Sequence, residues 1–145
     1  MTIDEVREHF KNHDTFAKHL GIELVEISNG YGVATMPFDE RHRNGMGSTH
    51  GGAIFALADM AFAAAANASG VFCVNAQTSI SYVSPGKIGP LTGVAKAIYM
   101  GRKMVTFDVE ITDAANTMVA KAIITGFTKG IPLTPGSPNP EKTAT

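Results

Sequence analysis

The chain has 145 residues, a formal net charge of −1 and one cysteine, Cys73. This length fits a single domain that buries roughly two-thirds of the surface its unfolded chain exposes. The balanced, dispersed charge excludes the electrostatic footprint of a protein that binds nucleic acid or an acidic membrane. A lone cysteine excludes an intrachain disulfide framework, and we expect a cytoplasmic protein.

The first part of the chain reads as a helix followed by a hairpin. Helical spacing of apolar residues predicts a helix over about residues 3–20. Two extended segments, residues 22–27 and 31–38, flank Ser28-Asn29-Gly30, a strong hairpin signal. The polar residues 39–48 form a loop, whose two spaced glycines predict a backbone lying close to another group.

A long helix is predicted next, from about His50 to Ser69. It is apolar on every side except at Asp59, and such a helix belongs in a protein interior. A carboxylate there is costly unless it is paired, and an unpaired one shifts its pKa. Asp59 is therefore a candidate for chemistry.

The rest of the chain favours β-structure, because runs of alternating apolar and polar residues are separated by turn residues. Strands are predicted at residues 72–83, 91–100, 103–112 and 117–128. From Pro132 onward, prolines among small polar residues predict disorder. We therefore expect one domain over residues 1–131 and a flexible tail over residues 132–145.

A helix that is apolar all round needs cover on most sides. One curved antiparallel sheet of about six strands, wrapped around that helix, is the economical α+β solution. An N-terminal helix completes the predicted architecture.

The residues that open the long helix are candidates for binding. Its first N–H groups lack internal acceptors, and Gly51 and Gly52 would let a substrate oxygen approach them, as in an oxyanion hole or anion site. Alone, two glycines more often permit close helix–sheet contact. Alone, His50 reads as a loop residue and Asn44 as a turn former. Their concentration near the helix that holds Asp59 favours a site.

Helix geometry separates the two halves of this site. Gly51 and Asp59 are eight residues apart, which is about 12 Å along a helix, whereas reacting groups must approach to roughly 3–3.5 Å. If both serve one substrate, they come from different chains. Two such helices related by a twofold axis would form a dimer with two composite sites.

The residues Asn44-Gly45, His50-Gly51-Gly52 and Leu57-Ala58-Asp59 together resemble the hotdog-fold thioesterases. The resemblance is closest to the PaaI-like subfamily, the phenylacetyl-CoA thioesterase type. It continues through residues 79–87 and 101–103 and covers about residues 20–128. It implies the hotdog fold and hydrolysis of an acyl-CoA thioester.

The resemblance also implies roles for individual residues. Asp59 would attack the thioester or activate a water, and the Gly51 N–H would polarise the carbonyl. Asn44 and His50 would order the loop and that donor, and Asn75 would help to position water.

Another branch of the family uses Glu with a hydroxyl residue one helical turn later. Here Asp59 and Ala63 stand at those positions, which fits the Asp-type subfamily.

Coenzyme A would be part of the substrate, and no cofactor or metal is expected. The resemblance implies that Arg102 and Lys103, with Lys87, lie near the nucleotide phosphates, although each is also explained as a solvated surface charge. His9 and His13 stand at i, i+4 and could bind a metal, but without a third ligand nearby we expect them to be exposed.

The acyl pocket is less well defined by sequence. Met46, Phe55, Met60 and Phe62 are candidates to shape it, and ordinary core packing explains them equally well. Cys73 is expected to be inert packing.

We therefore expect an enzyme that hydrolyses an aryl- or medium-chain acyl-CoA to the free acid and CoA. It would be at least a homodimer, and a tetramer formed as a dimer of dimers is expected, with no nucleic-acid or membrane partner. Two alternatives stay open: an acyl-thioester dehydratase or hydratase on the same fold, using His50 and Asp59, and a non-catalytic acyl-CoA-binding module. Acyl preference and the role of Asp59 as nucleophile or base also stay open.

Overall fold

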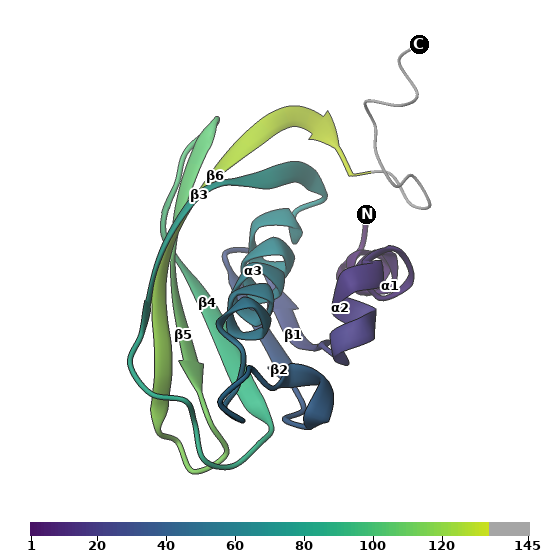
Figure 1. The fold of residues 1–145 in the computed structure, drawn as a ribbon. Coiled ribbons are helices and arrows are strands. Elements are labelled where there is room, and N and C mark those ends of the chain that lie inside the picture. The colour runs from purple at the N-terminus through teal and green to yellow at the C-terminus, as the bar shows by residue number, and fades with distance from the viewer. Residues whose placement is uncertain (134–145) are drawn as a thin grey trace.

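A curved antiparallel sheet wraps around one long helix in the computed structural model, which describes residues 1–133 (Figure 1). Six strands form the sheet within these residues, in the order β1-β2-β4-β5-β6-β3. The elements are α1 (Ile3–His13), α2 (Thr15–Leu20), β1 (Glu23–Ser28), β2 (Tyr31–Met36), a 3₁₀ turn (Glu40–His42), α3 (Gly51–Asn67), β3 (Val71–Tyr82), β4 (Leu91–Met100), β5 (Met104–Thr112) and β6 (Met118–Pro132). Helix α3 lies in the concave face, as predicted. Helices α1 and α2 lie on its other side (Figure 1).

The predicted N-terminal helix is wrong in one respect, because it is two helices that meet at Asp14. The Asp14 N–H donates to the Phe10 carbonyl at the end of α1, while its carboxylate accepts the Ala17 N–H at the start of α2. One aspartate thus caps both helices, and the chain turns there. Asp14 thereby comes to face α3.

The strands follow the sequence pattern closely, and the largest difference is at the end of β6. The hairpin between β1 and β2 turns at Asn29-Gly30, where only Gly30 takes a positive φ, of 77°. Strand β6 runs to Pro132, four residues past the predicted end, because Val71 of β3 pairs with it there, and the Leu133 N–H donates to the Gly70 carbonyl. The remaining tail, residues 134–145, lies outside the described residues.

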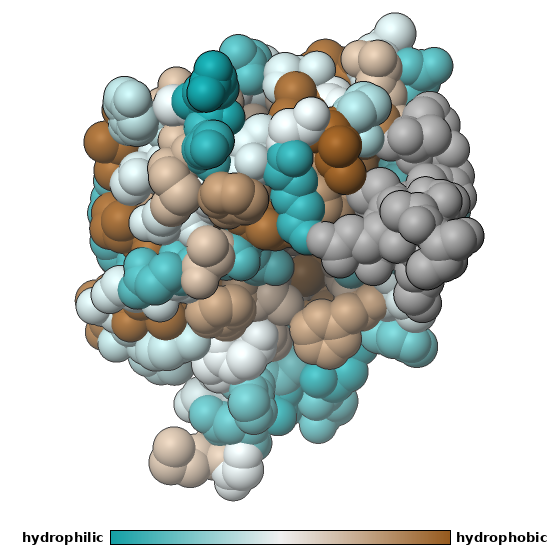
Figure 2. All heavy atoms as spheres, turned by 90° about the horizontal axis from the view of Figure 1, so that it is seen from above, coloured by the Kyte–Doolittle hydropathy of each residue, from teal (hydrophilic) through white to brown (hydrophobic). Residues whose placement is uncertain are grey.

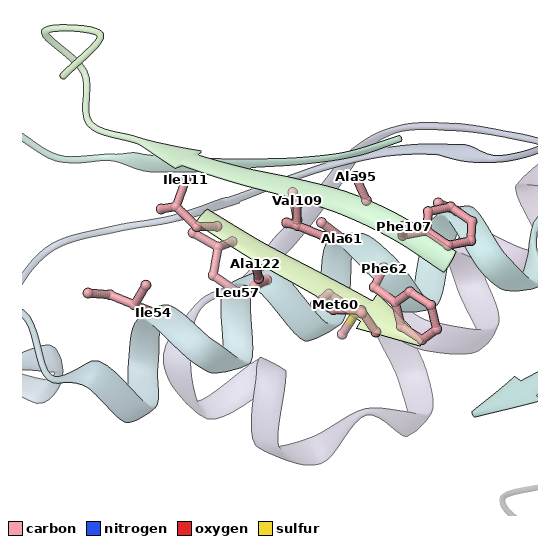
Figure 3. Packing of buried hydrophobic residues seen from close by; sticks show 14 of the residues in the cluster. Ile54, Leu57, Met60, Ala61, Phe62, Ala95, Phe107, Val109, Ile111 and Ala122 are labelled. Carbon is pink, nitrogen blue, oxygen red and sulfur yellow. The ribbon is translucent and has the colours of Figure 1, made fainter. Parts of the chain in front are cut away.

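Small residues let α3 lie close to the sheet. A Cβ on Gly32 of β2 would meet the Ala61 carbonyl oxygen at 2.6 Å and the Ala65 nitrogen at 3.0 Å, both backbone atoms of α3. Larger side chains from α3 point toward β5 and β6 and fill the core (Figure 3). Phe62 meets Phe107 edge to face, with ring centroids 5.3 Å apart.

Helix α3 is covered on most sides, as expected, but not on all of them. The sheet and the two short helices leave one stripe of α3 exposed or half-exposed. This open stripe consists of Gly52, Phe55, Ala56, Asp59 and Ala63. Its spacing of four, three and four residues from Gly52 through Ala56 and Asp59 to Ala63 follows a single helix face. Among the helices of residues 1–133, none combines the length and hydrophobicity needed to cross a membrane.

Replacing Gly32 with Ala should lower the free energy of unfolding by about 1–3 kcal/mol, because the new methyl group would press on the α3 backbone. The matched control is Gly45→Ala, where a Cβ meets nothing within 4 Å. Chemical denaturation would measure both variants. Equal stability of the two would show that α3 does not rest on β2 at this point.

Candidate functional site

Asp59 is half-buried on the open stripe of α3, and its partner is an amide rather than a cation. The Asn75 Nδ2 of β3 donates to Asp59 Oδ1 at 2.9 Å. The Thr78 hydroxyl lies 2.7 Å from Asn75 Nδ2 and 3.0 Å from Asn75 Oδ1, so it contacts both atoms of the amide. The structure thus brings together two of the predicted site residues and adds Thr78.

A β-bulge makes this arrangement possible. In a regular strand, residues three apart point to opposite faces of the sheet. The register of β3 against β6 shifts between Asn75 and Gln77, which lets Asn75 and Thr78 contact one another. Residue spacing cannot reveal such a shift, so the sequence did not identify Thr78.

Burial raises the pKa of the Asp59 carboxyl above its ordinary value. The Asn75 hydrogen bond opposes this, because it stabilises the charged form, and nearby Asp14 adds repulsion that raises the pKa again. Asp14 is a second site neighbour that sequence reasoning missed, since nothing local indicates that α2 packs beside α3.

The start of α3 presents a free backbone donor. His50 caps the helix, and its Nδ1 accepts the Gly52 N–H at 2.8 Å. No acceptor for the Gly51 N–H occurs among residues 1–133. The Tyr82 hydroxyl donates to the Gly51 carbonyl at 3.1 Å, and its ring would touch a Cβ at Gly51 at 3.4 Å. The donor is thus open and flanked by an aromatic ring.

The loop before α3 is ordered by two side chains. Asn44 Oδ1 accepts the Met46 and Ser48 N–H groups at 2.9 and 3.0 Å. His42, which sequence reasoning did not single out, is fully buried, and its ring nitrogens contact the Leu20 carbonyl and the Asp39 N–H. The His42 carbonyl in turn accepts the His50 N–H. The predicted close approach at the loop glycines is not seen, since a Cβ on Gly45 or Gly47 meets nothing within 4 Å.

Within one chain, the open donor and the carboxylate stay apart. Gly51 and Asp59 both lie in the continuous helix α3, so eight residues separate them by about 12 Å. One bound carbonyl cannot reach both groups in the same chain.

The three basic residues are not brought together. All three are exposed, but Lys87 precedes β4, whereas Arg102 and Lys103 follow its far end. The ten residues of β4 span roughly 33 Å. Lys87 is at the end of the molecule where the Thr49 hydroxyl contacts the Pro85 carbonyl, close to the start of α3.

The apolar candidates divide between core and surface. Phe62 is core, Met60 is buried, Phe55 is 36% exposed and Met46 is 88% exposed. Cys73 is a buried free thiol, and burial raises its pKa.

The expectation that both N-terminal histidines are exposed is wrong for His9, which is half-buried beside His13 with ring centroids 4.9 Å apart. Burial and the His13 charge lower the pKa of His9. Across residues 1–133, no three His, Cys, Asp or Glu side chains gather where they could hold a metal ion.

Comparison with known proteins gives consistent matches. The Thioesterase superfamily model matches residues 46–120. The acyl-coenzyme A thioesterase PaaI of Escherichia coli (strain K12) is 37% identical over 109 residues, covering 74% of this chain and 78% of that protein.

Two solved structures are also similar. The E. coli PaaI protein, from the phenylacetic acid degradation operon, has a TM-score of 0.83 at 31% identity, over 92% of this chain and 100% of that one. A hypothetical thioesterase from Streptococcus pneumoniae TIGR4, solved with coenzyme A, has a TM-score of 0.76 at 29% identity, over 83% and 97% of the two chains. The predicted hotdog fold is confirmed.

Replacing Asn75 with Ala should raise the pKa of Asp59 further, because the carboxylate loses the hydrogen bond that stabilises its charge. Carboxyl ¹³C NMR titration of aspartate-labelled protein would measure the change. Gln77→Ala, an exposed neighbour on the same strand, is the control. An unchanged titration in N75A would contradict the assigned contact.

Asp59→Asn should raise the melting temperature at neutral pH. A pKa raised in the folded state makes the Asp59 contribution to stability complete below the unfolded value, about 3.9, and lost as pH rises through the folded value. The difference between D59N and the unmodified protein should therefore be small near pH 3.5 and grow with pH. Calorimetry over this range would test it, and a lower melting temperature for D59N at neutral pH would refute it.

Proposed function

Since this chain belongs to the thioesterase superfamily and is a thioester hydrolase, we propose that it hydrolyses acyl-CoA to a free acid and coenzyme A. The observation that carries the proposal is the half-buried Asp59 carboxylate on the open stripe of α3, the same helix that begins with an unpartnered Gly51 N–H. The PaaI relative is named an acyl-CoA thioesterase, and a solved relative holds coenzyme A. An aryl or medium-chain acyl group is the proposed substrate class.

The chemistry needs few groups, because a thioester carries a good leaving thiolate. Attack at the carbonyl carbon, by Asp59 or by a water it deprotonates, moves negative charge onto the carbonyl oxygen. The Gly51 N–H at the positive end of α3 would stabilise that charge. Collapse of the tetrahedral intermediate breaks the C–S bond and releases CoA thiolate, which takes up a proton. On the water route the free acid forms in this step; if Asp59 attacks, water must then hydrolyse the acyl–Asp59 anhydride to the free acid and the carboxylate. This sequence of steps uses no metal or cofactor.

We propose that the Gly51 N–H reaches the carbonyl beside Asp59 from a second copy of the chain. Two copies packed through the open stripes, with their α3 helices antiparallel, would bring Asp59 of one copy to Gly51 of the other. Strand β3 supports this arrangement, since it is an edge of the sheet and holds Asn75. His50 would then keep its role as a cap rather than act as a base.

A second interface would join such dimers into a tetramer. Met104 and Phe127 pair across β5 and β6, and both are exposed on the convex face of the sheet. Tyr99 and Ile123 are exposed as well. Apolar side chains gathered on a sheet face are typical of a protein contact.

The dimer formed through the open stripes would also bring the basic residues of its two copies together. In a dimer with antiparallel α3 helices, Lys87 of one copy and the Arg102–Lys103 turn of the other lie toward the same end. We propose that this end receives the nucleotide phosphates of coenzyme A. The free thiol of Cys73 fits a reducing compartment such as the cytoplasm.

Subunit complementation would test the composite site. Asp59→Asn removes the carboxylate, and Gly51→Pro removes the N–H at the first helical position, where proline is tolerated. Each variant alone should lose at least about a hundredfold in kcat. Co-expressed copies should recover about a quarter of normal activity, because half the dimers are mixed and each has one intact site.

Thiol release from an acyl-CoA would be the assay. The negative control is a chain that carries both substitutions and is expressed alone. Recovery would disappear if Gly51 and Asp59 of the same chain formed the site. No thiol release from any aryl-, short- or long-acyl-CoA with the unmodified protein would refute the proposed function.

A further inference from the structure

Two cavities lie on either side of helix α1. The first, the β3 cavity, has a volume of about 330 Å³ and is lined by Ala63 and Asn67 of α3, Phe72 and Cys73 of β3, and His9 and His13 of α1. The second, the β1 cavity, has a volume of about 410 Å³. Its lining includes the apolar residues Ile22, Leu24 and Met60 and the charged residues Arg7, Glu8, Lys11, Lys18 and Glu23. Each is large enough for a small ligand. Figure 2 views the end of the molecule where α3 and β6 finish, and shows hydrophobic side chains around a recess.

Among residues 1–133, two line both cavities, Phe10 and Asp14. Asp14 is fixed, because its backbone and carboxylate cap α1 and α2. Phe10 packs against the core as a partly buried side chain, and its ring meets the His9 ring edge to face, with centroids 5.6 Å apart. The Phe10 ring is therefore the part of the partition that can be removed without losing a hydrogen bond.

Asp59 itself lines neither cavity, but residues near it in α3 do. Ala63, in the wall of the β3 cavity, follows Asp59 by one helical turn on the open stripe. Met60, in the wall of the β1 cavity, is the residue after Asp59. Asp14, in both walls, is close enough to Asp59 to raise the pKa of its carboxyl. An acyl group whose carbonyl lies at Asp59 thus has the β3 cavity beside it and the β1 cavity behind the Phe10 ring.

We propose that Phe10 is a specificity-determining residue: the acyl group occupies the β3 cavity, and the Phe10 ring closes that cavity against the β1 cavity and so limits acyl length. This rests on the proposed acyl-CoA hydrolysis. Phe10 lies on α1, outside residues 46–120, which match the superfamily model. Beyond the ring, Met60, Ile22 and Leu24 offer apolar surface to a longer chain.

The test compares kcat/KM for straight-chain acyl-CoA substrates of 4 to 16 carbons in the unmodified protein, Phe10→Ala and Phe16→Ala. Phe16 is an exposed phenylalanine of α2 that lines neither cavity, so it is the matched control. F10A should move the optimum to chains about four carbons longer and raise kcat/KM for them about tenfold, since each methylene in an apolar pocket discriminates by roughly that factor or more. F16A should keep the original profile.

Two further variants separate depth from stability. Phe10→Leu keeps apolar packing and should shift the optimum in the same direction by less, whereas Phe10→Trp should disfavour the longest chains accepted by the unmodified protein. If F10A only lowers the melting temperature and its chain-length profile parallels that of F16A, the proposal is overturned.

Binding of non-hydrolysable S-alkyl-CoA thioethers, measured by calorimetry, keeps this inference separate from the proposed reaction. The ratio of the dissociation constants for S-hexyl-CoA and S-hexadecyl-CoA measures the preference for the longer chain. A larger ratio in F10A than in the unmodified protein would support the Phe10 wall even if no thioester were hydrolysed. Thioester hydrolysis with the same chain-length dependence of binding in all variants would leave the reaction standing and reject the wall.

Discussion

One hydrogen bond, from the Asn75 amide to the Asp59 carboxylate, sets the conditions for everything else at this site. Burial on α3 raises the pKa of the carboxyl, and the amide restrains that rise without neutralising the charge. A cation in the place of Asn75 would have quenched the carboxylate as a base or nucleophile. An amide keeps it both anchored and reactive. The carboxylate can only accept, so it selects the NH₂ side of the amide, and the Thr78 hydroxyl gives the amide a second partner.

That bond requires α3 to lie close to the sheet, and small residues of the core allow this close approach. Alanine dominates α3, and Gly32 receives its backbone at a distance no side chain would allow. As a result, the sheet covers one side of α3, and the stripe that contains Asp59 stays exposed or half-exposed. Within α3, the exposed face is therefore the one where chemistry is proposed.

The start and the middle of α3 have separate roles. Its first residues display a backbone donor, which His50, Asn44 and Tyr82 order through contacts with neighbouring backbone. Its middle carries the carboxylate, about 12 Å away. A continuous helix holds these two groups at a fixed separation. The proposed reaction therefore needs a second copy of the chain, related by a twofold axis, to bring a donor to the carboxylate.

Local patterns in the sequence determined a good part of this protein. Alternation and turn residues predicted β2, β4 and β5 to within two residues, and the apolar run with a lone acid predicted α3 and singled out Asp59. The grouping of Asn44, His50 and Gly51 at its start could also be predicted, because these residues are near one another in the chain. The family resemblance added Asn75.

Only the tertiary structure decided what depends on contacts between distant segments. The bulge that lets Asn75 contact Thr78 arises from the pairing of β3 with β6. The turn at Asp14, the burial of His9 and the Phe10 wall arise because α1 and α2 pack across α3. Periodicity records which face of an element is apolar but not which neighbour covers it, and that choice of neighbour shapes the cavities beside Asp59.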